Sequence, residues 1–427
     1  MTRGQIASRV TSVAAGALLA IAVCAMPAGA AIASPASGLR TAAQLAGSGA
    51  RPAGCAANTG PGIAHCYLAT APASAGAAAA LAKNCTANAQ DGWSPCNLRS
   101  AYKLTSLSSS HGKGQTVAVI DAYDDPDAAS DLATYRSNFG LPACTTANGC
   151  FKKVNQDGLH GDYPTGDMGW GQEISIDLDM VSAICPKCHI LLVEANSNGF
   201  GDLFTAEQEA ITLGAHVVSN SWGSSEFAGE TDYDSTLDTP GVAITVSSGD
   251  GAYQGGVQYP SASPYVTSVG GTELTPASNP RSWIEKTWVT AGSSPPTQGS
   301  GSGCSVYEAK PAWQADAGCN NRTTADVSAV AADVLGYDSY ESGGGGWYFF
   351  FGTSVASPIT AAVYGLAGNA SSQSVAPASL AYANTSHLYD ITEGLATGTC
   401  SPTYLCKAVK GYDGPTGLGT PKGIGAY

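Results

Sequence analysis

The sequence predicts an α/β fold in which a doubly wound, mostly parallel sheet carries helices on both of its faces. From about Cys96 onward, apolar segments of strand length alternate with amphipathic segments of helix length. This order is typical of a parallel sheet covered on both sides. The chain has 427 residues, of which 44% are hydrophobic, so it can bury a large core.

The expected elements follow one another along the second part of the chain. Apolar runs predict strands at 115–123, 189–195, 215–222, 241–250 and 265–271. Amphipathic segments predict helices at 128–140, where Gly140 ends the helix, and at 202–214. The segment 291–303, rich in Gly and Ser, predicts a flexible surface loop. A glycine run, a short aromatic strand and a helix are expected within 342–368.

The chain divides into three parts. Residues 1–30 are predicted to be a signal peptide, because Arg3 and Arg9 precede a short apolar run that ends in small residues. Residues 31–95 form an extension rich in Ala, Gly and Ser, a candidate short pro-region, and residues 96–427 form the main domain. We therefore expect a secreted, extracellular protein. A lipoprotein anchor at Cys24 is the weaker alternative.

The cysteines predict a set of local disulfides. Loss of the leader removes Cys24 and leaves an even number of the 13 cysteines, which suits an oxidising compartment. A redox or metal site at Cys185 and Cys188 is the alternative for that pair, but no second CxxC with zinc-like spacing accompanies it. The expected pairs are Cys55–Cys66, Cys85–Cys96, Cys144–Cys150, Cys185–Cys188, Cys304–Cys319 and Cys400–Cys406.

The charge balance excludes some partners. The net charge is −14 before the two leader arginines are removed, so nucleic acid and anionic membranes are not expected to bind. Only 12% of the residues are charged, so much of the surface must carry uncharged polar side chains. Such a surface is compatible with an acidic habitat.

Ser354 is a candidate nucleophile. In "GTSVASP" it follows Gly352 and Thr353 where a strand passes into a helix, and Pro358 is expected in the first turn. A serine at the amino end of a helix lies where free N–H groups favour developing negative charge. The alternative is an ordinary helix-capping serine.

Glu173 and Asp177 are candidates for the base that the serine needs. They lie four residues apart and so share one face of a helix whose Ile176 and Met180 can face the core. Mutual repulsion and partial burial should raise the pKa of at least one of them, which suits catalysis in acid. The alternative is that both merely complement the dipole of a first helical turn.

Asp250 ends the strand in "SSGDGAY", at the sheet edge where open α/β folds place their sites. If it is protonated at low pH, its carboxyl group can donate a hydrogen bond to an oxyanion. A simple turn aspartate is the alternative.

These motifs resemble the sedolisin family of serine-carboxyl peptidases, relatives of subtilisin that act in acid. The resemblance covers residues 96–427 and rests on Glu173 with Asp177, on "SGD" and on "GTS" followed by Pro358, together with "SNSWG" and "TGLGTP" in the same order. It implies a subtilisin-like fold and an acyl-enzyme on Ser354. It also implies Glu173 as general base, Asp177 as its partner and Asp250 as oxyanion donor.

The resemblance further implies one structural calcium ion near the carboxyl end. The segments "LYDITEG" and "AVKGYDGPTG" match the family's calcium loop in part, with Val409 where a Gly is usual. Carboxylate and carbonyl oxygens are the ligands that calcium prefers. The implied ligands are Asp390, Asp413 and the carbonyls of Ile391, Val409 and Gly411.

The sequence departs from the family pattern in two respects. Residues before Cys96 are too few and too poor in core residues to form the long folded propeptide of the family, so the activation route stays open. Gly251 and Phe351 replace smaller or polar residues next to the site, which can reshape the substrate cleft.

Two alternative functions remain. A neutral subtilisin-type protease would use Asp121, His160 and Ser354, but no apolar helix follows "LHGDY". A catalytically silent secreted binding protein on the same scaffold is the other. We expect a monomeric endopeptidase that cleaves protein or peptide substrates and does not bind membranes after loss of the leader.

Overall fold

The computed structural model describes residues 51–56, 60–83, 85, 92–290, 298–340, 345–370, 376–396 and 399–427. The predicted signal peptide lies outside these residues. Among the described residues, no helix is long and apolar enough to cross a membrane.

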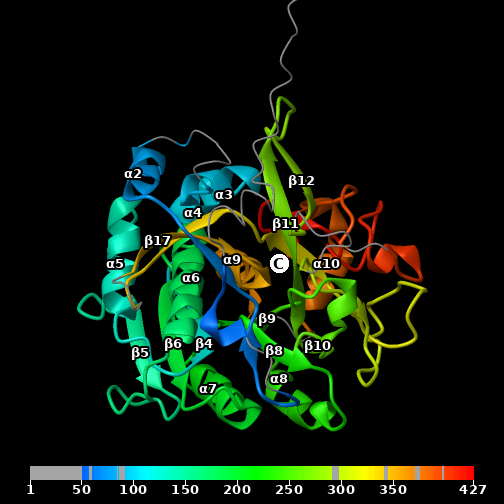
Figure 1. Cartoon of the computed structure of the whole chain (residues 1–427), viewed down its shortest axis with the longest axis horizontal. Coiled ribbons are helices and arrows are strands. Elements are labelled where there is room, and N and C mark those ends of the chain that lie inside the picture. The colour runs from blue at the N-terminus through cyan, green and yellow to red at the C-terminus, as the bar shows by residue number, and fades with distance from the viewer. Residues whose placement is uncertain are drawn as a thin grey trace, which may run out of the picture. The chain divides into compact units, whose positions relative to one another are not determined.

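The structure confirms the predicted α/β fold (Figure 1). In the central sheet the strand order is β12-β11-β9-β7-β4-β6-β5, and β15 pairs with β11. Neighbouring strands are parallel except for the β11–β12 pair. The strands are β4 (Thr116–Ala122), β5 (Phe151–Asn155), β6 (His189–Ala195), β7 (Val217–Asn220), β9 (Ala243–Ser247), β11 (Thr267–Pro276), β12 (Trp283–Thr287) and β15 (Val327–Val330).

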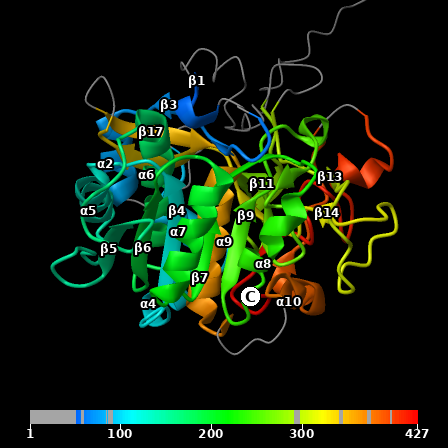
Figure 2. The ribbon, with the colours of Figure 1, turned by 90° about the horizontal axis from the view of Figure 1, so that it is seen from below.

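Helices pack on the sheet and on one another (Figures 1 and 2). The central helix α9 (Thr353–Ala367) packs against β7, β9 and β15 and against α6 (Met168–Ile184), which in turn contacts α5 (Ala128–Asn138). Helix α7 (Phe200–Thr212) packs against β4 and β6. Helix α6 is buried on all sides, from Gly169 to Ile184. The sheet and these helices place the carboxyl ends of the strands beside the amino ends of α6 and α9.

Part of the amino-terminal extension joins the main domain through two short strands. Strand β2 (His65–Cys66) pairs antiparallel with β8 (Trp222–Ser225), and β3 (Ala69–Pro72) pairs antiparallel with β17 (Gly346–Phe351). The remaining elements are β1 (Arg51–Pro52), α2 (Ala75–Lys83), α3 (Pro95–Ala101), α4 (Thr105–Ser110), α8 (Asp234–Leu237), β10 (Gln258–Tyr259), β13 (Gly303–Cys304), β14 (Thr323–Thr324), β16 (Val334–Asp338), α10 (Ala378–Ala383), β18 (Leu388–Tyr389) and β19 (Thr420–Pro421).

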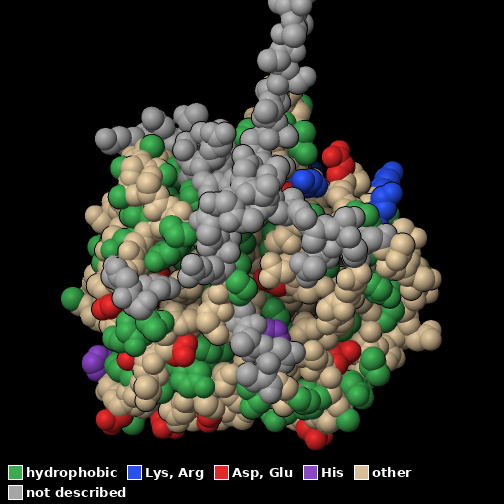
Figure 3. Space-filling model, in the orientation of Figure 1, with side chains coloured by type: hydrophobic (Ala, Val, Ile, Leu, Met, Phe, Trp, Pro, Cys, Tyr) green, Lys and Arg blue, Asp and Glu red, His purple; other side chains and the backbone are tan. Residues whose placement is uncertain are grey.

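All six predicted disulfides are confirmed. The CxxC pair forms a fully buried disulfide, which favours a structural link over the redox or metal alternative for Cys185 and Cys188. On the face shown in Figure 3, Lys and Arg side chains are few and Asp and Glu side chains are scattered, in keeping with the acidic composition.

Candidate active site

Helix α6 carries Glu173 and Asp177 on one face, and both carboxyl groups are fully buried. The helix begins at Met168, and Asp167 caps it by accepting a hydrogen bond of 2.9 Å from the Trp170 N–H. Its first turn contains no acidic residue. The interpretation of the two acids as first-turn partners of the helix dipole is therefore wrong.

The electrostatics of the pair agree with a site that works in acid. Burial raises the pKa of Glu173 well above its usual value, and the charges of Asp177 and Asp121 raise it further. Burial likewise raises the pKa of Asp177, while hydrogen bonding from Ser221 opposes the rise. These buried carboxyl groups cannot all be ionised together, so the cluster retains protons into the pH range where free carboxyl groups are charged.

A short hydrogen-bond chain connects Ser354 with Asp177 through Ser221. The Ser354 hydroxyl donates to the Ser221 carbonyl oxygen at 3.0 Å. The Ser221 hydroxyl lies 2.8 and 3.0 Å from the two carboxyl oxygens of Asp177. Within the described residues neither oxygen of Glu173 has a formed hydrogen bond, although the Ser354 hydroxyl lies near enough to lower its pKa.

The start of α9 positions Ser354. The helix begins at Thr353, after Gly352, whose φ of 129° favours glycine. Pro358 therefore lies inside the helix, and its expected place in the first turn is wrong. Because Pro358 has no N–H, it cannot donate to the carbonyl oxygen of Ser354 one turn earlier. The Ser221 hydroxyl lies 3.4 Å from that carbonyl oxygen instead.

Asp250 follows β9 and faces the same helix start. Its Oδ1 accepts hydrogen bonds from the Thr353 N–H at 2.8 Å and the Thr353 hydroxyl at 2.9 Å. Burial raises the pKa of Asp250 to about 8, and these hydrogen bonds only partly oppose the rise. Oδ2 would lie 2.7 Å from a Cβ on Gly352, so it borders the space that this glycine leaves open. A proton on Oδ2 would point toward a group held in that space.

The glycine-rich segment behind Asp250 differs from the prediction. The sequence predicts a flexible surface loop over 291–303; residues 291–297 lie outside the described residues, and residues 299–303 are buried. The Gly299 N–H donates to the Asp250 carbonyl at 2.9 Å, and the Gly301 N–H donates to the Gly249 carbonyl at 2.7 Å. A Cβ on Gly301 would lie 2.2 Å from the Ser248 carbonyl oxygen. Glycine serves here for close backbone approach and not for flexibility.

The subtilisin-type alternative requires Asp121, His160 and Ser354 to form one site, and the structure does not bring these three residues together. Asp121 is fully buried, and burial raises its pKa, as do the charges of Asp177 and Glu194. His160 is exposed, and its ring contacts that of Tyr163 at 6.0 Å. Among the described residues no histidine hydrogen-bonds Ser354 or Asp121. Sequence reasoning considered Asp121 only as a partner of histidine and missed its place beside Asp177.

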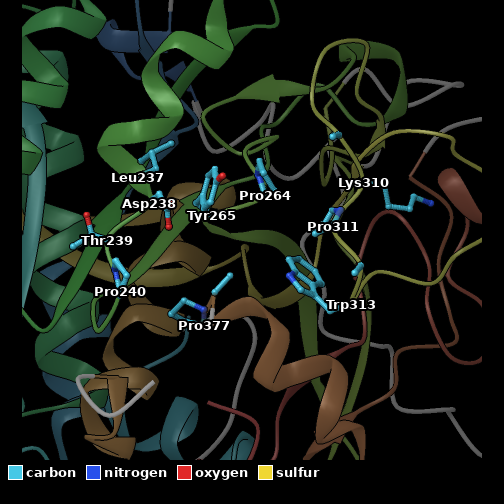
Figure 4. A pocket seen from close by; sticks show the side chains of 13 residues that line it. Leu237, Asp238, Thr239, Pro240, Pro264, Tyr265, Lys310, Pro311, Trp313 and Pro377 are labelled. Carbon is cyan, nitrogen blue, oxygen red and sulfur yellow. The ribbon is translucent and has the colours of Figure 1, made fainter. Parts of the chain in front are cut away.

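One cavity among the described residues borders this site, and another lies away from it. A cavity of about 290 Å³ borders Asp250, Gln258 and Tyr67. A second one, of about 390 Å³, is lined by side chains that include Tyr265, Lys310 and Trp313 (Figure 4). None of the four expected catalytic residues lines the second cavity.

The residues expected to bind calcium lie near one another at the carboxyl end. Asp413 is buried and accepts hydrogen bonds from Thr416 and from the Val409 N–H, whereas Asp390 accepts one of 2.9 Å from the Gly411 N–H. Burial raises the pKa of Asp413 to about 7, and the charge of Asp390 adds to the rise. Within the described residues, no hydrogen bond reaches the carbonyl oxygens of Ile391, Val409 and Gly411. These oxygens fit a hard cation such as calcium.

Known proteins are similar to this chain in sequence and in fold. A model of the subtilase family matches residues 112–387. Kumamolisin of Bacillus sp. (strain MN-32) is 27% identical over 365 residues, which are 78% of this chain and 62% of kumamolisin. Sedolisin of Pseudomonas sp. (strain 101) is 27% identical over 383 residues, which are 79% of this chain and 61% of sedolisin. The chain thus spans about three fifths of the length of these curated relatives.

A solved structure is similar over most of the described fold. It is that of Pseudomonas sedolisin, a serine-carboxyl proteinase complexed with two molecules of pseudo-iodotyrostatin, and it is 27% identical to this chain with a TM-score of 0.67. The match covers 78% of this chain and 95% of the sedolisin chain. The fold and the sequence therefore point to the same relatives.

Proposed function

The chain belongs to the subtilase family and is homologous to the sedolisins, and we propose on this premise that it is a secreted serine-carboxyl endopeptidase that acts in acid. One observation carries the proposal: the buried carboxyl groups of Glu173, Asp177 and Asp250, all with raised pKa values, lie on the segments that meet at the start of α9, and no described histidine hydrogen-bonds Ser354.

In this proposal Ser354 attacks the carbonyl carbon of the peptide bond, and Glu173 accepts its proton. Asp177 shares charge with Glu173 and is held by Ser221. The Ser354 N–H and a protonated Asp250 donate to the oxyanion that forms. Glu173 then returns its proton to the leaving amine, and water hydrolyses the acyl-enzyme in a second passage through the same groups.

The proposal includes one calcium ion, with a structural role and no role in catalysis. Asp390 and Asp413 would hold it together with the carbonyls of Ile391, Val409 and Gly411. Support comes from the carbonyl oxygens of Ile391, Val409 and Gly411, which accept no hydrogen bond within the described residues and are the type of ligand that calcium prefers. The disulfides support an oxidising, extracellular location. Residues 1–30 and 96–427 keep their proposed roles as leader and peptidase domain, and residues 31–95 are the extension that holds the candidate pro-region.

Digestion of denatured casein from pH 2 to pH 9 tests the proposal, with Ser354→Ala as the inactive control. We expect cleavage in acid that requires Ser354. Cleavage confined to neutral pH would favour the subtilisin-type alternative, because a catalytic histidine loses its function when it is protonated. Absence of Ser354-dependent cleavage at every pH would favour the silent binding protein.

A further inference from the structure

Residues 63–72 of the amino-terminal extension pass directly over the proposed catalytic serine. On one side of Ser354, β2 pairs with β8, the strand that directly follows Ser221. In this pairing His65 lies opposite Gly223 and Cys66 lies opposite Trp222. On the other side β3 pairs with β17, the strand that leads into α9. The Tyr67–Leu68 peptide bond therefore lies between two antiparallel pairings, as an extended substrate would.

The backbone of Tyr67 engages the catalytic groups at both of its polar atoms. Its N–H donates to the Ser354 hydroxyl oxygen at 3.1 Å, and its carbonyl oxygen accepts from the Ser354 N–H at 3.3 Å. A Cβ on Gly352 would lie 1.9 Å from this carbonyl oxygen and 2.7 Å from Oδ2 of Asp250. The Tyr67 carbonyl thus occupies the place that the mechanism assigns to the oxyanion.

The side chain of Tyr67 fills a pocket beside the same bond. It is 4% exposed, and its hydroxyl donates to Oε1 of Gln258 at 3.1 Å. Two glycines make the room: a Cβ on Gly223 would lie 2.5 Å from the phenol oxygen, and one on Gly249 would lie 3.6 Å from the ring. The pocket accepts an aromatic ring and offers one polar partner at its end.

The Cys55–Cys66 disulfide covers Glu173, the proposed general base. Both sulfurs and a Glu173 carboxyl oxygen lie within 4.8 Å of one another. Gly169 at the start of α6 is in close contact with Gly54, because a Cβ there would lie 2.7 Å from the Gly54 Cα. The bonded cysteines are not free to ligate a metal, so this cluster acts as a lid over Glu173. A second peptide cannot enter the groove while residues 63–72 occupy it.

We propose that the chain is made in a latent form in which its own Tyr67–Leu68 bond is the first substrate of Ser354, and that the pocket of Gly223, Gly249 and Gln258 selects aromatic side chains before the cleaved bond. This inference rests on the proposed function of Ser354 and supplies its activation step and substrate class.

The self-cleavage step follows the chemistry of the site. Ser354 Oγ forms a bond with the Tyr67 carbonyl carbon while its proton moves to Glu173. The bond from that carbon to the Leu68 nitrogen breaks, and the nitrogen takes the proton from Glu173 and becomes a new amino terminus. Water then adds to the Tyr67 ester, restores the Ser354 hydroxyl and leaves a carboxylic acid on Tyr67.

The disulfide pattern allows the cleaved piece to leave. Cys55 and Cys66 both precede the bond, and the other five disulfides all follow it. No disulfide between described residues therefore links the two products. After cleavage the piece that ends at Tyr67 is held by noncovalent contacts alone, while Leu68 and β3 stay with the domain through their pairing with β17.

Intact mass and amino-terminal sequencing of the full chain during incubation at pH 4 test the proposal. We expect a new amino terminus at Leu68 that appears together with casein digestion, after a lag, and neither event in Ser354→Ala. A wild type that digests casein with the Tyr67–Leu68 bond still intact, or after a cut elsewhere, would overturn this inference and leave the proposed function intact. If the wild type neither digests casein nor cuts itself, the proposed function falls as well.

A pair of variants tests the pocket. Tyr67→Phe keeps the ring and loses only the hydrogen bond to Gln258, so its rate of self-cleavage should stay within about tenfold of that of the wild type. Tyr67→Gly empties the pocket, so its rate should fall on the order of a hundredfold. Equal rates of self-cleavage in the two variants would contradict aromatic selection by the pocket.

Discussion

Replacing Glu207 with glutamine should stabilise the protein at pH 8 and leave its stability almost unchanged at pH 4. Glu207 in α7 has no exposed surface, and its Oε2 accepts a hydrogen bond of 2.7 Å from Asn220 Nδ2. Burial raises the pKa of Glu207 from its usual 4.5 to about 8. Between these two values the folded state holds a proton that the unfolded state has lost, so stability falls as the pH rises through this window.

The size of the effect follows from the two pKa values. A change from 4.5 to about 8, at about 1.4 kcal/mol per pKa unit, gives at most about 5 kcal/mol of stability lost between acid and pH 8. Glutamine keeps the shape and the acceptor for Asn220 but cannot ionise, so it should recover this loss. Below pH 4.5 the wild-type carboxyl group is protonated in both states, and the two proteins should be nearly equal.

Urea unfolding at pH 4 and pH 8 measures this difference. A Ser354→Ala background prevents self-digestion, and Glu393→Gln, which changes an exposed side chain, is the matched control. We expect a gain for Glu207→Gln at pH 8 only and no change for the control. A gain of the same size at both pH values would refute the reasoning, because the effect would then be unrelated to the buried proton.

Three further predictions concern the site and the calcium loop. Asp250→Asn keeps a donor that does not titrate, so kcat/KM measured from pH 4 to pH 9 should lose the fall near pH 8 that ionisation of Asp250 causes; a profile identical to that of the wild type would exclude its role as oxyanion donor. Asp177→Asn should lower turnover less than loss of the base does and should shift the acid limb of the same profile, whereas an unchanged acid limb would separate Asp177 from the titrating pair. Chelation should lower the Tm of the wild type, by the equivalent of about 3 kcal/mol at calcium a hundredfold above Kd, and Asp413→Asn should abolish the response; a wild-type Tm that does not respond to chelator would refute the calcium site.

The sequence predicts the strands, the disulfides and the edge of the sheet that carries the site, because these features depend on local patterns. Apolar runs place the strands, and cysteines near one another in sequence form the disulfides. The order of strands and helices brings Glu173, Asp250 and Ser354 to one edge of the sheet. These inferences need only short segments and the rule that the carboxyl ends of parallel strands meet.

The remaining features depend on long-range contacts that no local pattern reports. Residues 63–72 carry none of the motifs that mark the site, so nothing in their sequence predicts that Tyr67 contacts Ser354. Residues 299–303 look flexible because they are rich in glycine, yet the missing Cβ atoms allow burial. Ser221 lies in a recognised motif, but its link to Asp177 requires two distant segments to meet.

The most direct test of the carboxylate mechanism compares turnover at pH 4 for Glu173→Gln and His160→Ala. Glu173→Gln is nearly isosteric but cannot accept the Ser354 proton, so kcat should fall on the order of a thousandfold or more. His160 is exposed, so its replacement should leave kcat within about twofold, as surface changes away from a site generally do. Loss of activity in His160→Ala together with an active Glu173→Gln would contradict the mechanism and establish a histidine-dependent protease in its place.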